Sequence, residues 1–264
     1  MKAAVTRHPL RSLVVAFVLV VALAAVAIGV WRPWAPLTST GASASGSEPV
    51  VEPAPLVLPE HPTVLVFGDS WTYGSAASVP TLGYAYVLAD LLDGSTIVKG
   101  VRGSGYLKPG IDGPAYGERI ASLDPSLKPG LVIIQGSIND RAQGESGYRA
   151  AVTSAWDAMA AKYPAAQIVI LGPAPHELPV GTGTARIDRD LGALAAARGW
   201  WYISPIAEDW ITTANYLDVI DVVVGRRHPS TAGHRYLAER LAADLDALRA
   251  APVTEAGGTD GKAR

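Results

Sequence analysis

The sequence predicts an α/β fold in which helices cover both faces of a parallel sheet. Between residues 63 and 251, short apolar runs suited to buried strands alternate with segments whose apolar residues recur at helical spacing. Several of these runs end directly at glycine or small polar residues, as strands do where the chain leaves a sheet for a helix. Alternating elements of this kind are typical of βαβ units, whose strands run parallel.

Apolar runs and apolar stripes define the individual elements. Four runs are expected to be strands: 63–67 (TVLVF), 131–135 (LVIIQ), 167–171 (QIVIL) and 200–203 (WWYI). Four stripes predict helices: Tyr84, Val87, Leu88, Leu91 and Leu92; Tyr148, Val152, Trp156, Met159 and Tyr163; Ile187, Leu191 and Leu194; and Leu237, Leu241, Leu245 and Leu248. Ser230, after Pro229, is the expected N-cap of the last helix. We interpret the stripes as core packing that needs no cofactor.

Composition excludes several classes of function. The 264 residues are 49% hydrophobic and 17% charged, which suits a folded globular protein. A formal net charge of −2 gives no sign of nucleic-acid binding, which favours a basic face. The chain has no cysteine, so disulfides, a thiol nucleophile and cysteine-ligated metals are excluded.

The N-terminal region contains a candidate membrane segment. Residues 13–30 are 18 residues without a charge, a length of about 27 Å as a helix against roughly 30 Å of hydrocarbon. Lys2, Arg7 and Arg11 precede the run, which predicts that residues 1–12 stay cytoplasmic. We favour a retained transmembrane anchor, because the run exceeds the usual signal-peptide core of ~7–15 residues. The alternative is a secreted protein, cleaved after the Ala-x-Ala pattern at 42–44. Both readings place the remaining chain outside the cytoplasm.

The rest of the chain divides by composition. Residues 31–62, rich in Ser, Gly, Ala and Pro, are expected to form a flexible linker. Residues 63–251 have the size of one ordinary domain. Residues 252–264 are polar and are expected to be a disordered tail.

Four blocks of small and polar residues fall at predicted element ends. Residues 68–71 (GDSW) follow the first strand, and residues 136–140 (GSIND) follow the LVIIQ strand. Residues 100–106 (GVRGSGY) lie between them, and residues 227–230 (RHPS) open the last helix. Each block alone is ordinary turn chemistry. Together, at the sheet edge where α/β proteins place their sites, they indicate a functional site.

With these four blocks the chain resembles the GDSL/SGNH hydrolase family over about residues 63–250. The resemblance implies a flavodoxin-like three-layer α/β/α sandwich with a parallel sheet of about five strands. It also implies ester hydrolysis or acyl transfer without a cofactor. No metal-binding cluster such as H-E-x-x-H appears in the sequence, so no metal is expected. Ser70 matches the family's nucleophile and His228 its base. The backbone N–H groups of Ser70 and Gly103 and the side-chain amide of Asn139 match its oxyanion hole.

The residue chemistry supports the same assignment independently. A serine hydroxyl is a poor nucleophile until a neighbouring base takes its proton. Residues 63–251 contain three histidines. His228 lies just before a helix, at the sheet edge predicted for Ser70, whereas His234 falls inside that helix and is expected to be structural. His176 lies in a proline-rich loop (GPAPHELP), either as an ordinary loop residue or as part of the pocket.

Two departures from the family pattern concern the groups around the base and the amide. The family's D-x-x-H motif has its acid three residues before the histidine, and Gly225 occupies that position here. Three replacements are possible, in order of preference: a backbone carbonyl on the imidazole ring, the Asp221 carboxylate, or that of Asp218. The usual Gly-x-Asn-Asp reads Ser-Ile-Asn-Asp at 137–140, with Gly136 one place early.

These observations predict an exported, membrane-anchored serine esterase that cleaves small acyl esters, including O-acetyl groups on glycans. Its expected partners are an ester or acylated glycan and the membrane, but no nucleic acid. A catalytically inactive glycan-binding or scaffold module, favoured by Gly225, is the alternative, and acyl transfer would use the same residues. Trp71, Tyr73 and Tyr106 lie beside the blocks, where they either stack on sugars or pack under loops. Asp69 and Asp140 are expected to brace the turns.

Overall fold

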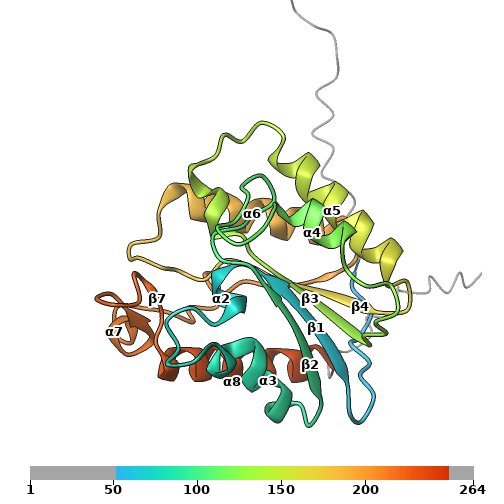
Figure 1. The fold of residues 1–264 in the computed structure, drawn as a ribbon, viewed down its shortest axis with the longest axis horizontal. Coiled ribbons are helices and arrows are strands. Elements are labelled where there is room, and N and C mark those ends of the chain that lie inside the picture. The colour runs from blue at the N-terminus through green and yellow to red at the C-terminus, as the bar shows by residue number, and fades with distance from the viewer. Residues whose placement is uncertain (1–51, 250–264) are drawn as a thin grey trace, which may run out of the picture. The chain divides into compact units, whose positions relative to one another are not determined.

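A five-stranded parallel sheet forms the centre of the protein, as the computed structural model shows for residues 52–249 (Figure 1). The strand order is β2-β1-β3-β4-β5, the flavodoxin-like order. The strands are β1 (Thr63–Gly68), β2 (Ser95–Gly100), β3 (Leu131–Gln135), β4 (Gln167–Leu171) and β5 (Trp201–Ile203). The direction in which strands are added reverses between β1 and β3, so a crevice is expected at their carboxyl ends.

Helices cover both faces of this sheet, as predicted (Figure 1). One face carries α3 (Tyr84–Leu91) and α8 (Thr231–Arg249), and the other carries α4 (Tyr116–Ala121), α5 (Tyr148–Lys162) and α6 (Thr182–Ala196). Shorter elements lie in the connections: α2 (Ser70–Tyr73), α7 (Tyr216–Val219), the 3-10 helices η1 (Pro80–Leu82) and η2 (Ile138–Ala142), and the antiparallel pair β6 (Ile220–Asp221) and β7 (His228–Pro229).

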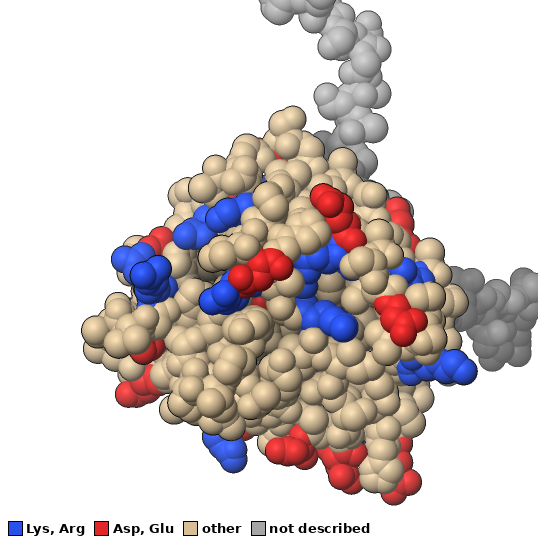
Figure 2. All heavy atoms as spheres, in the orientation of Figure 1, with Lys and Arg blue, Asp and Glu red and all other residues tan. Residues whose placement is uncertain are grey.

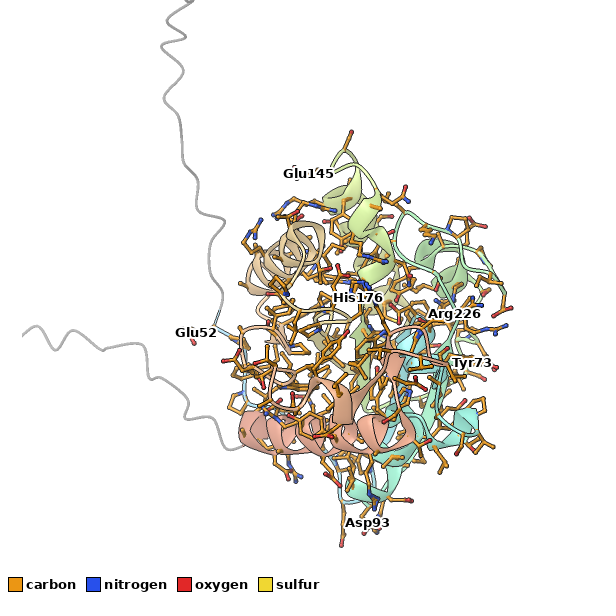
Figure 3. The ribbon with its side chains drawn as sticks, turned by 90° about the vertical axis from the view of Figure 1, so that its left-hand side faces the viewer. Glu52, Tyr73, Asp93, Glu145, His176 and Arg226 are labelled. Atoms are coloured by element: carbon orange, nitrogen blue, oxygen red, sulfur yellow. The ribbon has the colours of Figure 1, made fainter. Side chains whose placement is uncertain are left out.

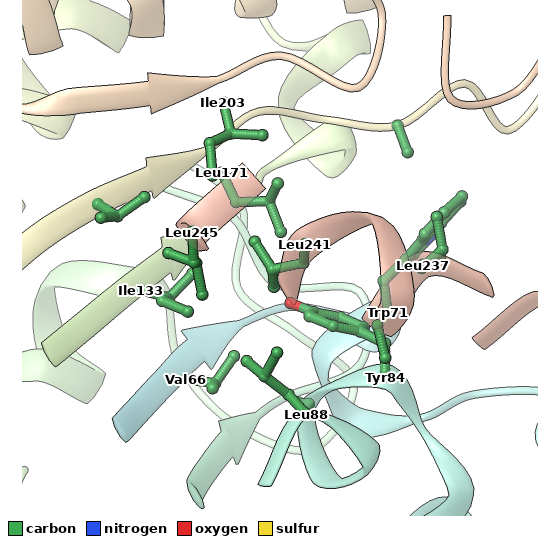
Figure 4. Packing of buried hydrophobic residues seen from close by; sticks show 14 of the residues in the cluster. Val66, Trp71, Tyr84, Leu88, Ile133, Leu171, Ile203, Leu237, Leu241 and Leu245 are labelled. Atoms are coloured by element: carbon green, nitrogen blue, oxygen red, sulfur yellow. The ribbon is translucent and has the colours of Figure 1, made fainter. Parts of the chain in front are cut away.

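Strand β1 shows how the sequence builds two cores. Successive side chains of a strand point to opposite faces. Val64 and Val66 therefore pack with α3 and α8, as Figure 4 shows for Val66. Leu65 and Phe67 pack with α4, α5 and α6 on the other face. Because β1 is buried on both faces, its sequence is continuously apolar rather than alternating.

Some elements do not follow from the apolar pattern. Strand β2 lies at the sheet edge, where Ser95 and Lys99 are exposed, so its sequence lacks the apolar run that marks the inner strands. Short α4 and α7 and the two-residue strands β6 and β7 are likewise too brief to give a periodic signal. The strand predicted at 200–203 begins at Trp201.

The ordered packing extends upstream of Thr63. Leu56 and Leu58 are buried, and the Leu56 N–H donates a hydrogen bond to the Leu248 carbonyl at 3.1 Å. The indole N–H of Trp201 donates to the Ala54 carbonyl at 2.8 Å. The predicted anchor at 13–30 and tail at 252–264 lie outside the described residues. Within residues 52–249, no helix combines the length and apolar character needed to span a bilayer.

Candidate active site

Ser70 is the first residue of α2, directly after β1. Asp69 caps this helix, because its carboxylate accepts a hydrogen bond from the Trp71 N–H at 2.9 Å. The Asp69 N–H in turn donates to the side-chain oxygen of Gln135, at the end of β3, at 3.2 Å. The turn that carries Ser70 is therefore fixed to both strands at the point where the sheet order reverses.

His228 meets Ser70 although 158 positions separate them. His228 Nε2 lies 2.8 Å from Ser70 Oγ, and His228 Nδ1 lies 2.8 Å from the carbonyl oxygen of Gly225. A carbonyl only accepts hydrogen bonds, so this contact assigns the ring proton to Nδ1 and leaves Nε2 free to accept one from the serine. The imidazole is thus oriented as a general base toward Ser70 Oγ.

The acid nearest to this histidine in the hairpin makes other contacts. The carboxylate of Asp221 accepts hydrogen bonds from the N–H groups of Val223 at 2.9 Å and Val224 at 3.0 Å. Backbone hydrogen bonds, with that of Gly225 the largest contribution, lower the pKa of Asp221. In residues 52–249 no carboxylate forms a hydrogen bond or ion pair with the His228 ring. Of the three replacements considered from sequence, the backbone carbonyl is the one in contact.

The close packing around position 225 explains why this residue is a glycine. A Cβ at this position would lie 2.7 Å from the Cβ atoms of both Ala76 and Asp221, well inside ordinary contact distance. Asp218, the third replacement considered, lies on α7, where its backbone carbonyl accepts a hydrogen bond from Ser230. The packing around position 225 therefore leaves no room for an aspartate side chain, and the Gly225 carbonyl is the group at the imidazole.

The predicted oxyanion donors surround one cleft. Within the described residues, the N–H groups of Ser70 and Gly103 have no hydrogen-bond partner, and both residues line the cleft. Gly103 has a left-handed backbone with φ of +74°, which explains the glycine. The Asn139 amide also faces the cleft, but it donates to the Ser104 carbonyl at 2.9 Å and lies 3.3 Å from an Asp69 carboxylate oxygen. For Asn139 to bind an oxyanion, the longer contact with Asp69 must be exchanged.

Asp140 ties the third block to the second. Its buried carboxylate accepts hydrogen bonds from the N–H groups of Tyr106 at 2.7 Å, Leu107 at 3.2 Å and Lys108 at 3.0 Å. The Ser137 hydroxyl donates to the same group at 2.5 Å. Charge-assisted bonds of this kind are about twice as strong as neutral ones, so Asp140 holds the loop beyond Gly103 in place. This is the bracing role expected from the sequence.

Arg119 on α4 forms hydrogen bonds that support the site. The sequence analysis does not predict this role. Its buried guanidinium donates to the Gly68 carbonyl at 2.9 Å, the Ser104 hydroxyl at 2.8 Å and the Lys99 carbonyl at 2.5 Å. It therefore links the carboxyl ends of β1 and β2 to the loop after β2. Burial raises the pKa of Asp69 to about 6, and the charge of Arg119 opposes that rise. The available sequence signal was one arginine between the apolar residues of a short helix.

Gln135 and Gly136 shape the turn that differs from the family pattern. The Gln135 side-chain oxygen accepts hydrogen bonds from the Asp69 N–H and, at 3.0 Å, from the Thr72 hydroxyl. Gly136 has φ of +127°, and a Cβ there would lie 2.5 Å from the Tyr116 hydroxyl oxygen, which donates to the Gln135 carbonyl. Glycine is required at 136 for both reasons. Asn139 still reaches the cleft.

His234 and His176 lie outside the reacting pair. His234 is fully buried, where Nδ1 accepts the Tyr84 N–H at 3.3 Å and Nε2 donates to the Ser75 carbonyl at 3.0 Å. Burial lowers the pKa of His234 from 6.5 to about 4. The unfolded chain therefore binds this proton first, and stability is lost as pH falls from about 6.5 to 4. His176 does not line the cleft, and its Nε2 lies 3.8 Å from a Glu177 carboxylate oxygen.

Two of the three aromatic residues considered for sugar stacking belong to the core. Trp71 is 4% exposed and Tyr106 is 5% exposed, and the Tyr106 hydroxyl accepts a hydrogen bond from the Trp156 indole at 2.7 Å. Packing under loops is therefore the correct alternative for both. Tyr73 lines the cleft and remains available to a ligand.

The cleft itself has a volume of about 820 Å³ and lies over the Ser70–His228 pair. Tyr73 and Arg226, which are labelled in Figure 3, both line this cleft. The rest of the lining comes from the loop after α2, the loop after β2, η2 and the β6–β7 hairpin. It includes Ser75, Ala76, Arg102, Lys108, Ile111, Asn139 and Val224. In the described part of the chain, no group of histidines and acids is arranged to hold a metal ion.

Comparison with known proteins decides the family. The sequence pattern of the GDSL-like Lipase/Acylhydrolase family matches residues 66–236. The chain belongs to this family. A GDSL lipase of Mycobacterium tuberculosis is 30% identical over 142 residues, which are 53% of this chain and 59% of that protein. The match therefore spans less than two thirds of that relative.

Solved structures share the fold at lower identity. The native aryl esterase of M. smegmatis aligns with a TM-score of 0.53 and 20% identity, over 71% of this chain and 99% of that one. A two-domain esterase active on acetylated mannans aligns with a TM-score of 0.56 and 19% identity, over 77% of this chain and 53% of that one. At these identities the likeness establishes the α/β architecture.

Proposed function

We propose that this GDSL-family protein is a serine ester hydrolase in which Ser70 is the nucleophile and His228 the general base. The observation that carries the proposal is the continuous contact from Ser70 Oγ to His228 Nε2, and from His228 Nδ1 to the Gly225 carbonyl, each at 2.8 Å. A nucleophile, its base and a group that orients the base are the elements of an activated serine.

The geometry supports the following cycle. As Ser70 Oγ bonds to the ester carbon, its proton moves to His228 Nε2, and the carbonyl oxygen becomes an oxyanion. The free N–H groups of Ser70 and Gly103 donate to that oxyanion, and Asn139 joins them by releasing Asp69. Collapse breaks the bond to the alkoxide, which leaves with the proton from Nε2.

Water then attacks the acyl-enzyme and gives its proton to His228 Nε2. The bond between the acyl carbon and Ser70 Oγ breaks, Oγ takes the proton from Nε2, and the acid is released. The Gly225 carbonyl is a dipole, so it stabilises the imidazolium less than a carboxylate would. This weaker stabilisation is the feature that distinguishes the proposed dyad from a full triad.

For the substrate and location, we propose small acyl esters, including O-acetyl groups on glycans, outside the cytoplasm. One structural neighbour acts on acetylated mannans, and Tyr73 gives the cleft an aromatic ring. The uncharged run at 13–30 supports export and membrane anchoring.

The test is hydrolysis of 4-nitrophenyl acetate by the purified full chain. Ser70→Ala should reduce turnover by at least about 10³-fold, and His228→Ala should act comparably because the two groups work as a unit. Ser154→Ala, which removes an exposed hydroxyl on α5, is the matched control. Activity of Ser70→Ala equal to that of the unaltered protein would exclude the mechanism.

A fluorophosphonate separates the esterase from the inactive binding module that Gly225 favours. An activated serine should be labelled at Ser70, as identified by mass spectrometry, and labelling should disappear in His228→Ala. An unlabelled Ser70 in folded protein would support the inactive module. Product analysis with sugar acceptors distinguishes hydrolysis from acyl transfer.

A further inference from the structure

The cleft over Ser70 carries positive charge that no carboxylate neutralises. Lys108 and Arg226 both line it and are exposed, and within residues 52–249 neither forms an ion pair or a side-chain hydrogen bond. The third basic residue, Arg102, donates two hydrogen bonds to the Asp112 carboxylate, at 2.6 and 2.9 Å, so its charge is balanced. Two unbalanced cations therefore face the space in which a substrate must lie.

The acidic residue that lines the cleft does not cancel this charge. Asp221 is the acid among the lining residues, and its carboxylate is turned to the backbone N–H groups of Val223 and Val224. Even with Asp221 and Asp112 both counted against the three basic residues, one positive charge remains. The whole chain, by contrast, has a formal net charge of −2. The residues that line the cleft therefore carry a net charge opposite in sign to that of the protein.

The hairpin between β6 and β7 holds its two arginines on different sides. Arg226 and Arg227 both have left-handed backbones, with φ of +50° and +67°, a conformation that is unfavourable for a residue with a Cβ. Arg226 lines the cleft over Ser70, whereas Arg227 lines the neighbouring groove and forms an ion pair with Glu177. Strained positions of this kind gather at functional sites. Here the turn leaves one guanidinium free at the cleft.

We propose that the ester cleaved at Ser70 carries a carboxylate or phosphate group, which Arg226 and Lys108 bind. The inference rests on the proposed esterase function and specifies its substrate class as an acylated anionic molecule, such as a sugar with an acidic group. A guanidinium presents paired N–H groups that match either anion, and a lysine adds a point charge. Tyr73, beneath the Arg102 guanidinium at 5.4 Å, supplies an apolar surface next to these charges.

The experiment compares three acetate esters that differ in charge. The substrates are 4-acetoxybenzoate, 4-acetoxyphenyl phosphate and the neutral 4-acetoxybenzamide, each assayed for kcat/KM with the full chain. The ratio of anionic to neutral kcat/KM should fall about three- to tenfold in Arg226→Gln and somewhat less in Lys108→Gln, as expected for charge-assisted contacts in an open cleft. The carboxylate and phosphate arms show which anion is preferred. Salt at 0.5 M should reduce the preference, because it screens exposed charges.

Lys128→Gln is the matched control. Lys128 is exposed and lies just before β3, at the amino ends of the strands, whereas Ser70 lies at their carboxyl ends. The substitution therefore removes the same charge far from the cleft. Ratios that stay unchanged in Arg226→Gln and Lys108→Gln, with Ser70-dependent cleavage of the neutral ester, would overturn the inference and leave the esterase proposal intact.

A binding measurement keeps the two proposals separate. If no ester is cleaved, the esterase proposal fails, and calorimetric titration of the Ser70→Ala protein with 4-acetoxybenzoate and 4-acetoxybenzamide still tests the charge preference. Tighter binding of the carboxylate that is lost in the Ser70→Ala, Arg226→Gln double variant supports the inference. Equal binding of the two compounds contradicts it.

Discussion

Adding a side chain at Gly225 should impair the protein, even when that side chain is the acid of the D-x-x-H motif. A Cβ at this position would lie 2.7 Å from the Cβ atoms of Ala76 and Asp221 and 3.0 Å from Asp221 Cγ. Carbon atoms in ordinary contact lie about 3.5–4.0 Å apart, so two neighbours must each move by roughly 1 Å. Such overpacking costs about 1–3 kcal/mol of unfolding free energy.

The effect on catalysis follows from what Gly225 contacts. Its carbonyl is 2.8 Å from His228 Nδ1, and a shift of about 1 Å would break or misdirect that hydrogen bond. Misplacement on this scale can cost roughly 100-fold in rate. Both Gly225→Ala and Gly225→Asp should therefore lower kcat/KM, by about 10- to 100-fold.

The assay pairs urea unfolding with hydrolysis of 4-nitrophenyl acetate. Gly113→Ala is the control, since a Cβ there meets Val101 at an ordinary 3.5 Å. Ala76→Gly combined with Gly225→Ala should recover part of the loss, because it removes one clashing atom and relieves the left-handed backbone of Ala76, with φ of +72°. If Gly225→Asp matched or exceeded the unaltered protein in activity and stability, the steric argument would be wrong.

Three further predictions test the site and its support. Asn139→Ala should lower kcat by roughly 100-fold with little change in KM, because an oxyanion donor acts in the transition state. A loss of unfolding free energy as large as the loss of transition-state stabilisation would contradict this. Asp140→Ala should lower the unfolding free energy in urea by about 3 kcal/mol, because it leaves buried N–H groups unpaired. For His234→Gln, the stability difference from the unaltered protein should shrink by about 3 kcal/mol between pH 7 and pH 4, as the buried imidazole of the unaltered protein loses its contribution. A pH-independent difference would exclude the lowered pKa of His234.

Controls for these variants come from residues of the same type elsewhere. Asp157→Ala is the control for Asp140→Ala. It removes an exposed acid from α5 whose ion pair with Arg198 lies at the surface. His61→Gln removes an exposed histidine and serves the pH experiment. Each control should change stability by less than about 1 kcal/mol across the pH range.

The inner strands and the long helices follow from the sequence, because burial on both faces imposes continuous apolar runs and one-sided burial imposes helical stripes. Strands β1, β3 and β4 and helices α5 and α8 lie where those patterns place them. Strand β2 escapes detection because an edge strand exposes polar side chains such as Lys99. The buried residues Leu56 and Leu58 are not predicted either, because two apolar residues among prolines form no helical or alternating pattern.

The sequence predicts some polar residues of the site but not others, because only some of them lie in recognisable turns. Ser70, Gly103, Asn139 and His228 occupy short blocks at element ends, where the chain itself marks a turn. Arg119 acts through space, on carbonyls 20 and 51 positions away in sequence, so nothing in its neighbourhood marks its role.

The sequence by itself determined the α/β architecture and the blocks that line one sheet edge, because both follow from local spacing along the chain. Only the tertiary structure decided which group holds His228: Asp221 lies four residues from Gly225, yet its carboxylate is occupied by backbone N–H groups while the Gly225 carbonyl reaches the ring. It also decided that Arg226 faces the cleft and Arg227 faces away. Neighbours in sequence diverge at such turns because backbone angles and close packing, rather than residue type, set where each group points.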